Sequence, residues 1–524
     1  MSDAAGTDAP TAAERREILI VLPGLLLTIM LAMLDQLIVG TALPRIVGSL
    51  GGVDHLAWVV TAYTLASVVT TPFYGKLGDM YGRKRFFVVA IVIFLVGSAL
   101  SGLSHSMGEL IAFRALQGLG AGGLMTSSMA TLGDIVPPRE RGRYMSYMMV
   151  VMMLATIAGP LLGGFITDHF SWRWIFYINL PVGGAALVYL LATLHLPVRR
   201  VSHRIDYLGG VVLAVAATAL VLLATWGGTE YTWGSVEIVG LAVLAVAATI
   251  GFIMIERRAQ EPIMPLHVFR NGNFSLSMAL VFLIGMVMFG GMTFLPEYQQ
   301  TVQGESATLS GLLLTPMMVG VTITSILSGQ VMTRTGRYKV FPILGGAIMT
   351  VAIVLLTHLG PNTTRTTTAL YYVVLGLGMG FMMQMASVIS QNSVELKDMG
   401  VASSGRMFFQ QIGGSLGVSA LGAVFARRLT EDLTAAAAQG RGAVHISASG
   451  GQLDPTVIDK LPEAAKHLVF PAIAHAVDTV FWWALPAAAL TFVLAWFIKE
   501  VPLRGRAGPS EQPAQEPEFE SPLA

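Results

Sequence analysis

The sequence predicts an all-α protein that crosses a membrane many times, and three observations carry this prediction. Hydrophobic residues make up 54% of the 524 residues and charged residues 12%, whereas soluble domains are about 25% charged. Apolar runs of about 20 residues, each able to span a bilayer core as a helix, recur along almost the whole chain. Lys and Arg gather in alternate connections between these runs. We count about fourteen runs, which begin near Ile18, His55, Arg85, Glu109, Arg143, Trp172, Asp206, Trp233, Phe274, Ala307, Lys339, Thr366, Met399 and Pro471.

The charge bias predicts the orientation, because basic loops stay on the cytoplasmic side. With a cytoplasmic N-terminus, the inner connections hold the cations from Lys76 to Arg85, Arg139 to Arg143, Arg199 to Arg204, Arg257 to Arg270 and Arg334 to Lys339. The short outer connections hold only Arg45, Arg173 and Arg365. We therefore expect an even number of crossings of the cell inner (cytoplasmic) membrane, with both termini in the cytoplasm.

A repeated loop predicts two bundles of six helices. Gly75, Gly82, Arg83 and Arg85 align with Gly329, Gly336, Arg337 and Lys339, although a chance match of tight basic turns would look the same. Internal repeats are common in secondary transporters. The predicted division is a cytoplasmic segment 1–16, an N-terminal bundle 17–200, inserted helices 201–258, a C-terminal bundle 259–500 with a long outer loop at about 427–470, and a disordered cytoplasmic tail 501–524.

Asp35 and Arg114 are charges inside apolar runs, where a charge costs roughly 2.5–3.5 kcal/mol on insertion scales. Each lies about 6 residues from the outer end of its span, so both sit roughly 9 Å deep. Burial disfavours the ionised form of a carboxylate and a nearby arginine favours it. The pair is therefore a candidate for proton coupling; the alternative is a static salt bridge between two helices. Gln117, one turn from Arg114, is either a ligand contact or an interhelical hydrogen bond.

Three further groups are candidates for gating. Gly159, Pro160 and Gly163 combine a helix kink with a bare face, which indicates either a seal against leakage or plain packing. Gly75, Asp79, Gly82 and Arg83 form the first basic loop, where Asp79 can meet a helix N-terminus and Arg83 can pair with Asp134. Arg406 is a second buried cation, which could also extend to the inner interface.

A substrate cavity is expected from adaptable and polar side chains within the spans. The chain has 28 Met, and thioether side chains suit a site that accepts varied apolar shapes, although most serve as ordinary core. Trp58 and Tyr63 are either ligand contacts or interfacial anchors. The candidate cavity residues are Gln117, Trp58, Tyr63, Met152, Phe294, Glu297 and Gln384.

The sequence lacks the motifs that several classes of function require. The sequence has no phosphate-binding loop and no nucleophile elbow, and no cysteine. We therefore expect neither an enzyme nor a cofactor, and no metal site. The formal net charge of +1 without a basic cluster gives no indication of nucleic acid.

These motifs resemble the major facilitator superfamily, and within it the fourteen-span drug:proton antiporter family. The resemblance covers roughly residues 15–500 and rests on Leu34 to Pro44, Gly75 to Arg85, Arg114 to Gly120, Gly159 to Gly164 and Trp172 to Asn179. It implies the major facilitator fold and proton-driven multidrug efflux by alternating access. Ala155 replaces a usual glycine, and Leu37 and Gly40 replace usual Thr and Asn. The acidic residues that some relatives use for divalent cations in helices 10 or 13 are absent.

The sequence therefore predicts a proton-coupled antiporter that exports lipophilic, monovalent cationic or neutral, drug-like compounds and so gives antibiotic resistance. The expected partners are small hydrophobic molecules, protons and membrane lipid, and the expected state is a monomer. The alternative is an exporter of lipids or glycolipids to the cell envelope. Nutrient symport and a non-transporting receptor are further rivals.

Overall fold

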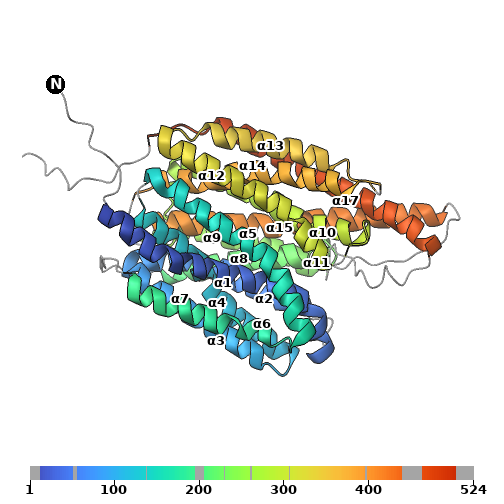
Figure 1. Ribbon diagram of the computed structural model, residues 1–524, viewed down its shortest axis with the longest axis horizontal. Coiled ribbons are helices and arrows are strands. Elements are labelled where there is room, and N and C mark those ends of the chain that lie inside the picture. The colour runs from blue at the N-terminus through green and yellow to red at the C-terminus, as the bar shows by residue number, and fades with distance from the viewer. Residues whose placement is uncertain are drawn as a thin grey trace, which may run out of the picture.

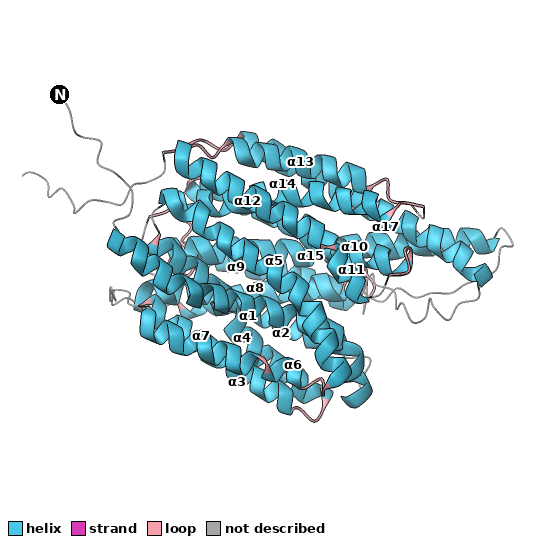
Figure 2. Cartoon of the chain, viewed as in Figure 1, coloured by secondary structure: helices cyan, strands magenta, loops and turns pink. Residues whose placement is uncertain are grey.

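The computed structural model describes residues 12–50, 56–136, 138–194, 206–228, 231–259, 262–305, 307–360, 362–395, 398–438 and 463–502. Within these ranges almost every residue is helical (Figure 2). The one β element there is an isolated bridge between Gly227 and Tyr231. This confirms the expected all-helical architecture. The ends of the chain and most of the predicted outer loop lie outside the described residues.

Most of the N-terminal helices lie in the lower part of the molecule in Figure 1, and α5 runs through its middle. Among them α4 packs against both α2 and α3, and α1 packs against α5 and α7. Their bounds are α1 (Ala12–Leu50), α2 (Leu56–Tyr81), α3 (Arg83–Leu103), α4 (Met107–Ile135), α5 (Pro138–His169), α6 (Trp174–Tyr177) and α7 (Asn179–Thr193).

The C-terminal helices form the upper part of the molecule in Figure 1. Here α10 packs against α15, and α14 packs against both α12 and α13. Their bounds are α10 (Gly272–Thr301), α11 (Ala307–Leu313), α12 (Thr315–Thr335), α13 (Val340–Leu356), α14 (Arg365–Asn392), α15 (Met399–Ala438) and α17 (Glu463–Trp496), with the short 3-10 turn η2 (Val268–Arg270) before them.

Helices α8 (Tyr207–Trp226) and α9 (Val236–Glu256) form a hairpin between the two groups. α8 packs against α2 on one side and α15 on the other. Leu213 and Val221 of α8 share an apolar cluster with Val68 of α2 and Phe408 of α15. α9 keeps most of its apolar surface outward, so the hairpin presents a lipid-compatible face.

Eleven helices in the described residues are long and apolar enough to cross a membrane. α13, with 17 residues, is a shorter apolar helix. α2 and α4 are 26 and 29 residues long and carry charged side chains, among them Lys76 and Asp79 in α2 and Arg114 in α4. The chain is therefore a multi-pass membrane protein.

The two aligned loops share one backbone feature. Gly82 precedes α3 with φ 98°, and Gly336 follows α12 with φ 71°. Only glycine enters this left-handed region without strain, which explains a glycine at each turn. We call the end of the molecule with these turns the basic end, because Arg83, Arg85 and Arg337 lie beside them. The division into repeats stays a prediction.

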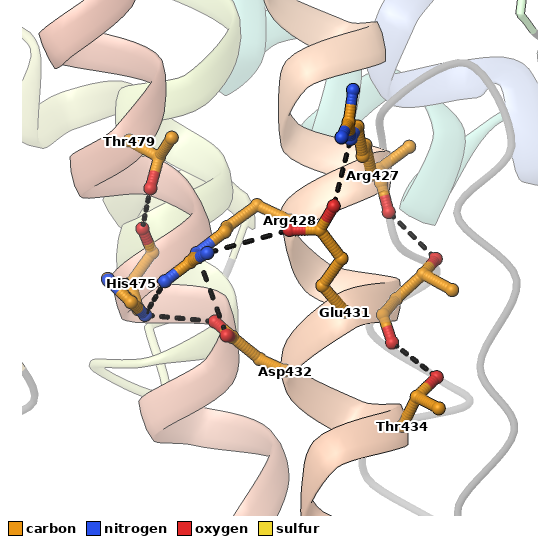
Figure 3. Close-up of polar contacts among 9 residues, drawn as sticks. Arg427, Arg428, Glu431, Asp432, Thr434, His475 and Thr479 are labelled. Atoms are coloured by element: carbon orange, nitrogen blue, oxygen red, sulfur yellow. Dashed lines mark hydrogen bonds and ion pairs between the residues drawn. The ribbon is translucent and has the colours of Figure 1, made fainter.

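At the opposite end, α15 and α17 extend beyond the other helices (Figure 1). The predicted outer loop at 427–470 is thus helical as far as Ala438 and again from Glu463. Asp432 of α15 accepts from the Nδ1 atom of His475 in α17 at 2.9 Å, and Arg428 lies 3.6 Å from the same carboxylate (Figure 3). These polar contacts join the two extensions.

Replacing Asp432 with asparagine should change little. The side chains involved are partly solvent-exposed, and surface ion pairs contribute about 0–1 kcal/mol. We expect Asp432→Asn to keep the thermal unfolding temperature of the purified protein nearly constant and its export rate within twofold. A large loss of export at unchanged stability would instead place this cluster in the transport mechanism.

Candidate functional site

Asp35 and Arg114 form a buried ion pair between α1 and α4. The Nη1 atom of Arg114 donates to Oδ2 of Asp35 at 2.8 Å, and each residue is 1% exposed. Two charges removed from water need good geometry and further hydrogen bonds to be tolerated. The matching depth predicted from the sequence thus corresponds to direct contact in the structure.

Amide side chains complete the pair. Gln117 accepts from Nη1 of Arg114 at 2.8 Å and donates from its own Nε2 to Oδ1 of Asp35, also at 2.8 Å. Asn179, the first residue of α7, donates to the same Oδ1 at 2.7 Å and to Oγ of Ser98 in α3 at 3.0 Å. The carboxylate therefore meets three donors from two helices other than its own.

An aromatic ring covers the guanidinium. The Cζ atom of Arg114 lies 4.1 Å from the ring centroid of Tyr63 in α2, and 5.8 Å from that of Phe176 in α6. A cation over a ring face is stabilised by the quadrupole of the ring, more so away from water. Nε of Arg114 also donates weakly to the carbonyl of Val59 at 3.4 Å. Arg114 therefore retains partners even when the charge on Asp35 is neutralised.

Sequence reasoning did not select Asn179 or Ser98 as site residues. Asn179 entered only as the end of a family-like segment, and Ser98 is a single hydroxyl in an apolar run. Both are nevertheless buried, at 2% and 0% exposure. The available signal was that a lone amide at the start of an apolar span requires a buried partner.

Asn179→Ala should remove two hydrogen bonds, one of them to an ionised group. Hydrogen bonds to charged groups contribute about 1.5–3 kcal/mol. We expect a loss of unfolding free energy of that size, measured as a lower thermal unfolding temperature of the purified protein. Ser98→Ala keeps the Asn179 contact to Asp35 and should cost less. Equal losses in the two variants would contradict a direct role of Asn179 at the carboxylate.

At the basic end, Arg83 lies between two carboxylates. Its Nη2 atom is 2.7 Å from Oδ1 of Asp79, and its side chain also pairs with Asp134 at the end of α4. Asp79 in turn faces the N-terminus of α15, where the helix dipole favours a negative charge. The loop expected to act as a latch thus links α2, α3 and α4 to a C-terminal helix.

Glycines let α2 and α15 meet at this latch. A Cβ atom on Gly400 would lie 2.5 Å from both carboxylate oxygens of Asp79 and 2.5 Å from the carbonyl of Gly75. A Cβ atom on Gly75 would lie 2.3 Å from Oγ of Ser404. The two backbones approach too closely for any other residue, so the basic end is closed.

The predicted glycine face of α5 lies against α1. A Cβ atom on Gly159 would be 2.6 Å from Cβ of Leu37, two residues after Asp35. α5 remains helical through Pro160 and Gly163, and it also packs against α12 and, less extensively, α14. α5 therefore connects the region of Asp35 with the C-terminal helices.

The other predicted cavity residues do not gather around Asp35 and Arg114. Trp58 contacts Trp226 of the hairpin, with ring centroids 5.5 Å apart. Phe294 packs on Phe425 of α15 at 5.7 Å, while Glu297 is buried one turn further along α10 and Gln384 is buried in α14. Met152 packs against apolar clusters of both helix groups. For these residues a role in a cavity stays a prediction.

The side chains around Asp35 and Arg114 offer charge and hydrogen bonds. Among the residues that the structure describes, no group of three His, Asp or Glu side chains is placed to hold a metal ion. The carboxylate of Asp35 is held by one arginine and two amides, so charge and hydrogen bonds join α1, α4 and α7 at this site.

Comparison with known proteins identifies the architecture. The family model described as Major Facilitator Superfamily matches residues 25–418. An MFS-type transporter of Mycobacterium tuberculosis is 41% identical over 508 residues, 95% of this chain and 73% of that protein. The multidrug transporter protein MdtP of Bacillus subtilis is 34% identical over 515 residues, 94% of this chain and 95% of that protein. The solved proton:xylose symporter XylE shares the fold at a TM-score of 0.61 and 13% identity, covering 94% of this chain and 98% of that one.

Proposed function

Because this chain belongs to the Major Facilitator Superfamily, we propose that it is a proton-coupled antiporter that exports lipophilic compounds by alternating access. Family membership makes it a membrane transporter and not an enzyme, and two Bacillus subtilis relatives, named a multidrug transporter and a multidrug resistance protein, align over nearly the whole chain. We propose the direction of transport, the coupling to protons and the class of substrate.

The proposal that protons are coupled to transport rests on one observation. The carboxylate of Asp35 is buried and is surrounded by Arg114, Gln117 and Asn179. A proton on Oδ2 removes the charge attraction to Arg114. The guanidinium then keeps its contacts with Gln117, the Val59 carbonyl and the rings of Tyr63 and Phe176. The contact between α1 and α4 weakens as a result. Release of the proton restores the ion pair.

Helix packing supplies a path from that carboxylate to the interface. Leu37 follows Asp35 on α1 and meets Gly159 of α5. On the far side of α5, the hydroxyl of Thr322 in α12 donates to Sδ of Met153 at 3.7 Å. A shift of α1 that accompanies proton binding therefore acts on the contact between the two helix groups.

Alternation also requires the basic end to open. In this proposal the contacts of Asp79 and Arg83 hold that end closed, and their separation gives access from the cytoplasm. The charge bias of the loops supports a location in the cytoplasmic membrane with the basic end inside. The long apolar spans and many methionines support lipophilic substrates, with monovalent cationic or neutral compounds expected from the sequence.

Reconstitution with an imposed pH gradient tests the function. Purified protein in liposomes should move dyes and antibiotics against their gradient only when protons flow the opposite way. Collapse of the gradient with a protonophore should stop this movement. Equal flux with and without the gradient would contradict antiport, and transport of fluorescent lipids alone would favour the alternative, an exporter of lipids or glycolipids.

A further inference from the structure

Arg406 is a buried cation that the proposed proton mechanism does not use. It lies in the half of α15 nearest the basic end and is 5% exposed. Ser403, Arg406, Met407 and Gln410 follow one another at three- and four-residue spacings, so they share one face of the helix. The contacts of its neighbours therefore show where this face points.

The face of Arg406 points to the meeting place of three other helices. Oγ of Ser403 accepts from Gln391 of α14 at 3.4 Å. Sδ of Met407 accepts from the hydroxyl of Thr126 in α4 at 3.6 Å. Nε2 of Gln410 lies 3.9 Å from Sδ of Met288 in α10. Arg406 thus lies where the C-terminal helices meet the N-terminal helices.

Arg406 has no carboxylate partner among the described residues. Its one hydrogen bond there goes from Nη1 to Oε1 of Gln410, at 3.3 Å. The buried arginines Arg83 and Arg114 each pair with a carboxylate. A guanidinium has five N–H donors, and a neutral amide gives no counter-charge. A buried charge without a partner is costly, so Arg406 lacks an anion.

The side chains near Arg406 indicate which other chemical groups a bound anion would contain. Met288, which Gln410 contacts, belongs to an apolar cluster with Met317, Met318, Met382 and Met383. Thioether side chains adapt to apolar groups of varied shape. Arginine binds a carboxylate or sulfonate through paired N–H donors. An apolar body with one acidic group fits both features.

We propose that Arg406 is an anion-binding subsite and that lipophilic compounds with a single carboxylate or sulfonate are substrates of this protein. The inference rests on the proposed export function. It changes the charge class expected from the sequence, because neither a cation nor a neutral compound neutralises Arg406.

Because Arg406 is buried, binding of the anion is also coupled to closure of the basic end. The contacts beside it join α4 to α15: Thr126 meets Met407, and a Cβ atom on Gly133 would be 2.8 Å from Cε of Met399. Separation of these helices uncovers the guanidinium. When the helices close again, the guanidinium is buried, and the free-energy cost of its burial is lower when an anion is bound to it. The anion therefore favours the closed state by its higher affinity for it.

Three probes with one apolar body test the subsite: pyrenebutanoate, its methyl ester and a pyrenylbutyl trimethylammonium salt. Binding is measured on the full-length protein in nanodiscs at pH 7.5 without a pH gradient. We expect the wild type to bind the carboxylate at least tenfold more tightly than the ester. Arg406→Gln should weaken binding of the carboxylate tenfold or more and change the other two probes less than twofold. Arg406→Lys should recover part of the loss.

The outcomes separate the subsite from the export function. Equal affinity of the wild type for carboxylate and ester would overturn the subsite even if Arg406→Gln did not fold. An equal loss for all three probes in a folded Arg406→Gln protein would assign Arg406 a structural role only. Export is measured separately, as gradient-driven flux of the ester in liposomes. If no flux is found, the binding data still decide whether Arg406 is an anion-binding subsite.

Discussion

Asp35→Asn should abolish substrate export driven by a pH gradient while the protein still inserts into the membrane. Asparagine keeps the shape of the side chain and can still accept from Gln117 or Asn179, but it cannot exchange a proton. It also leaves Arg114 buried without its counter-charge. Losing one partner of a buried pair costs about 3–5 kcal/mol, so we expect a lower thermal unfolding temperature as well. The measurement is flux in liposomes at a fixed pH difference.

A double variant separates coupling from folding. Asp35→Asn combined with Arg114→Gln removes both charges, so it should recover stability relative to Asp35→Asn without recovering gradient-driven flux. Glu431→Gln is the matched control, because it removes an exposed carboxylate of α15 that pairs with the neighbouring Arg427 and Arg428. Undiminished flux in Asp35→Asn would exclude this carboxylate from the coupling.

Gly400→Val should force the basic end open. The new Cβ atom would lie 2.5 Å from the Asp79 carboxylate and from the carbonyl of Gly75, a distance that packed atoms do not tolerate. A change of only about 1.4 kcal/mol between two states alters their ratio tenfold. We expect export to fall tenfold or more. Spin labels at Arg85→Cys and Thr335→Cys should report a new population at longer distance, in a chain that contains no native cysteine.

Gly184→Val is the control for added volume. A Cβ atom on Gly184 of α7 would meet nothing within 4 Å, so valine should be accommodated there. Export and label distances in this variant should match those of the labelled parent. If Gly400→Val gave the same result, the contact between α2 and α15 would not be what holds the basic end closed.

The sequence predicted that Asp35 and Arg114 lie at matching depth, because a charge is costly in an apolar span and because helical rise fixes depth. The structure shows that the two side chains are in contact. It left Gln117 open between two roles. In the structure this residue bonds to both members of the pair and thus acts as an interhelical hydrogen-bonding group. The Arg83–Asp134 pair was predicted by similar reasoning, from charges at adjoining helix ends.

Other features depended on contacts that sequence spacing does not encode. Asn179 reaches Asp35 only because α7 returns beside α1, 144 residues along the chain. Trp58 meets Trp226 because the inserted hairpin docks beside α2. That no described carboxylate lies near Arg406 likewise depends on how four helices meet. Helix periodicity predicts the face of a residue, but the partner of that face is fixed by packing.

Proton release on substrate binding tests the central claim most directly. The purified protein is placed in weakly buffered solution without a pH gradient. A neutral lipophilic probe, the pyrenebutanoate methyl ester, is then added, and a pH indicator measures the protons released. We expect the wild type to release protons as it binds the probe, and the Asp35→Asn, Arg114→Gln double variant to release none. Equal release from both proteins, or probe binding without release in the wild type across the pH range of activity, would contradict it.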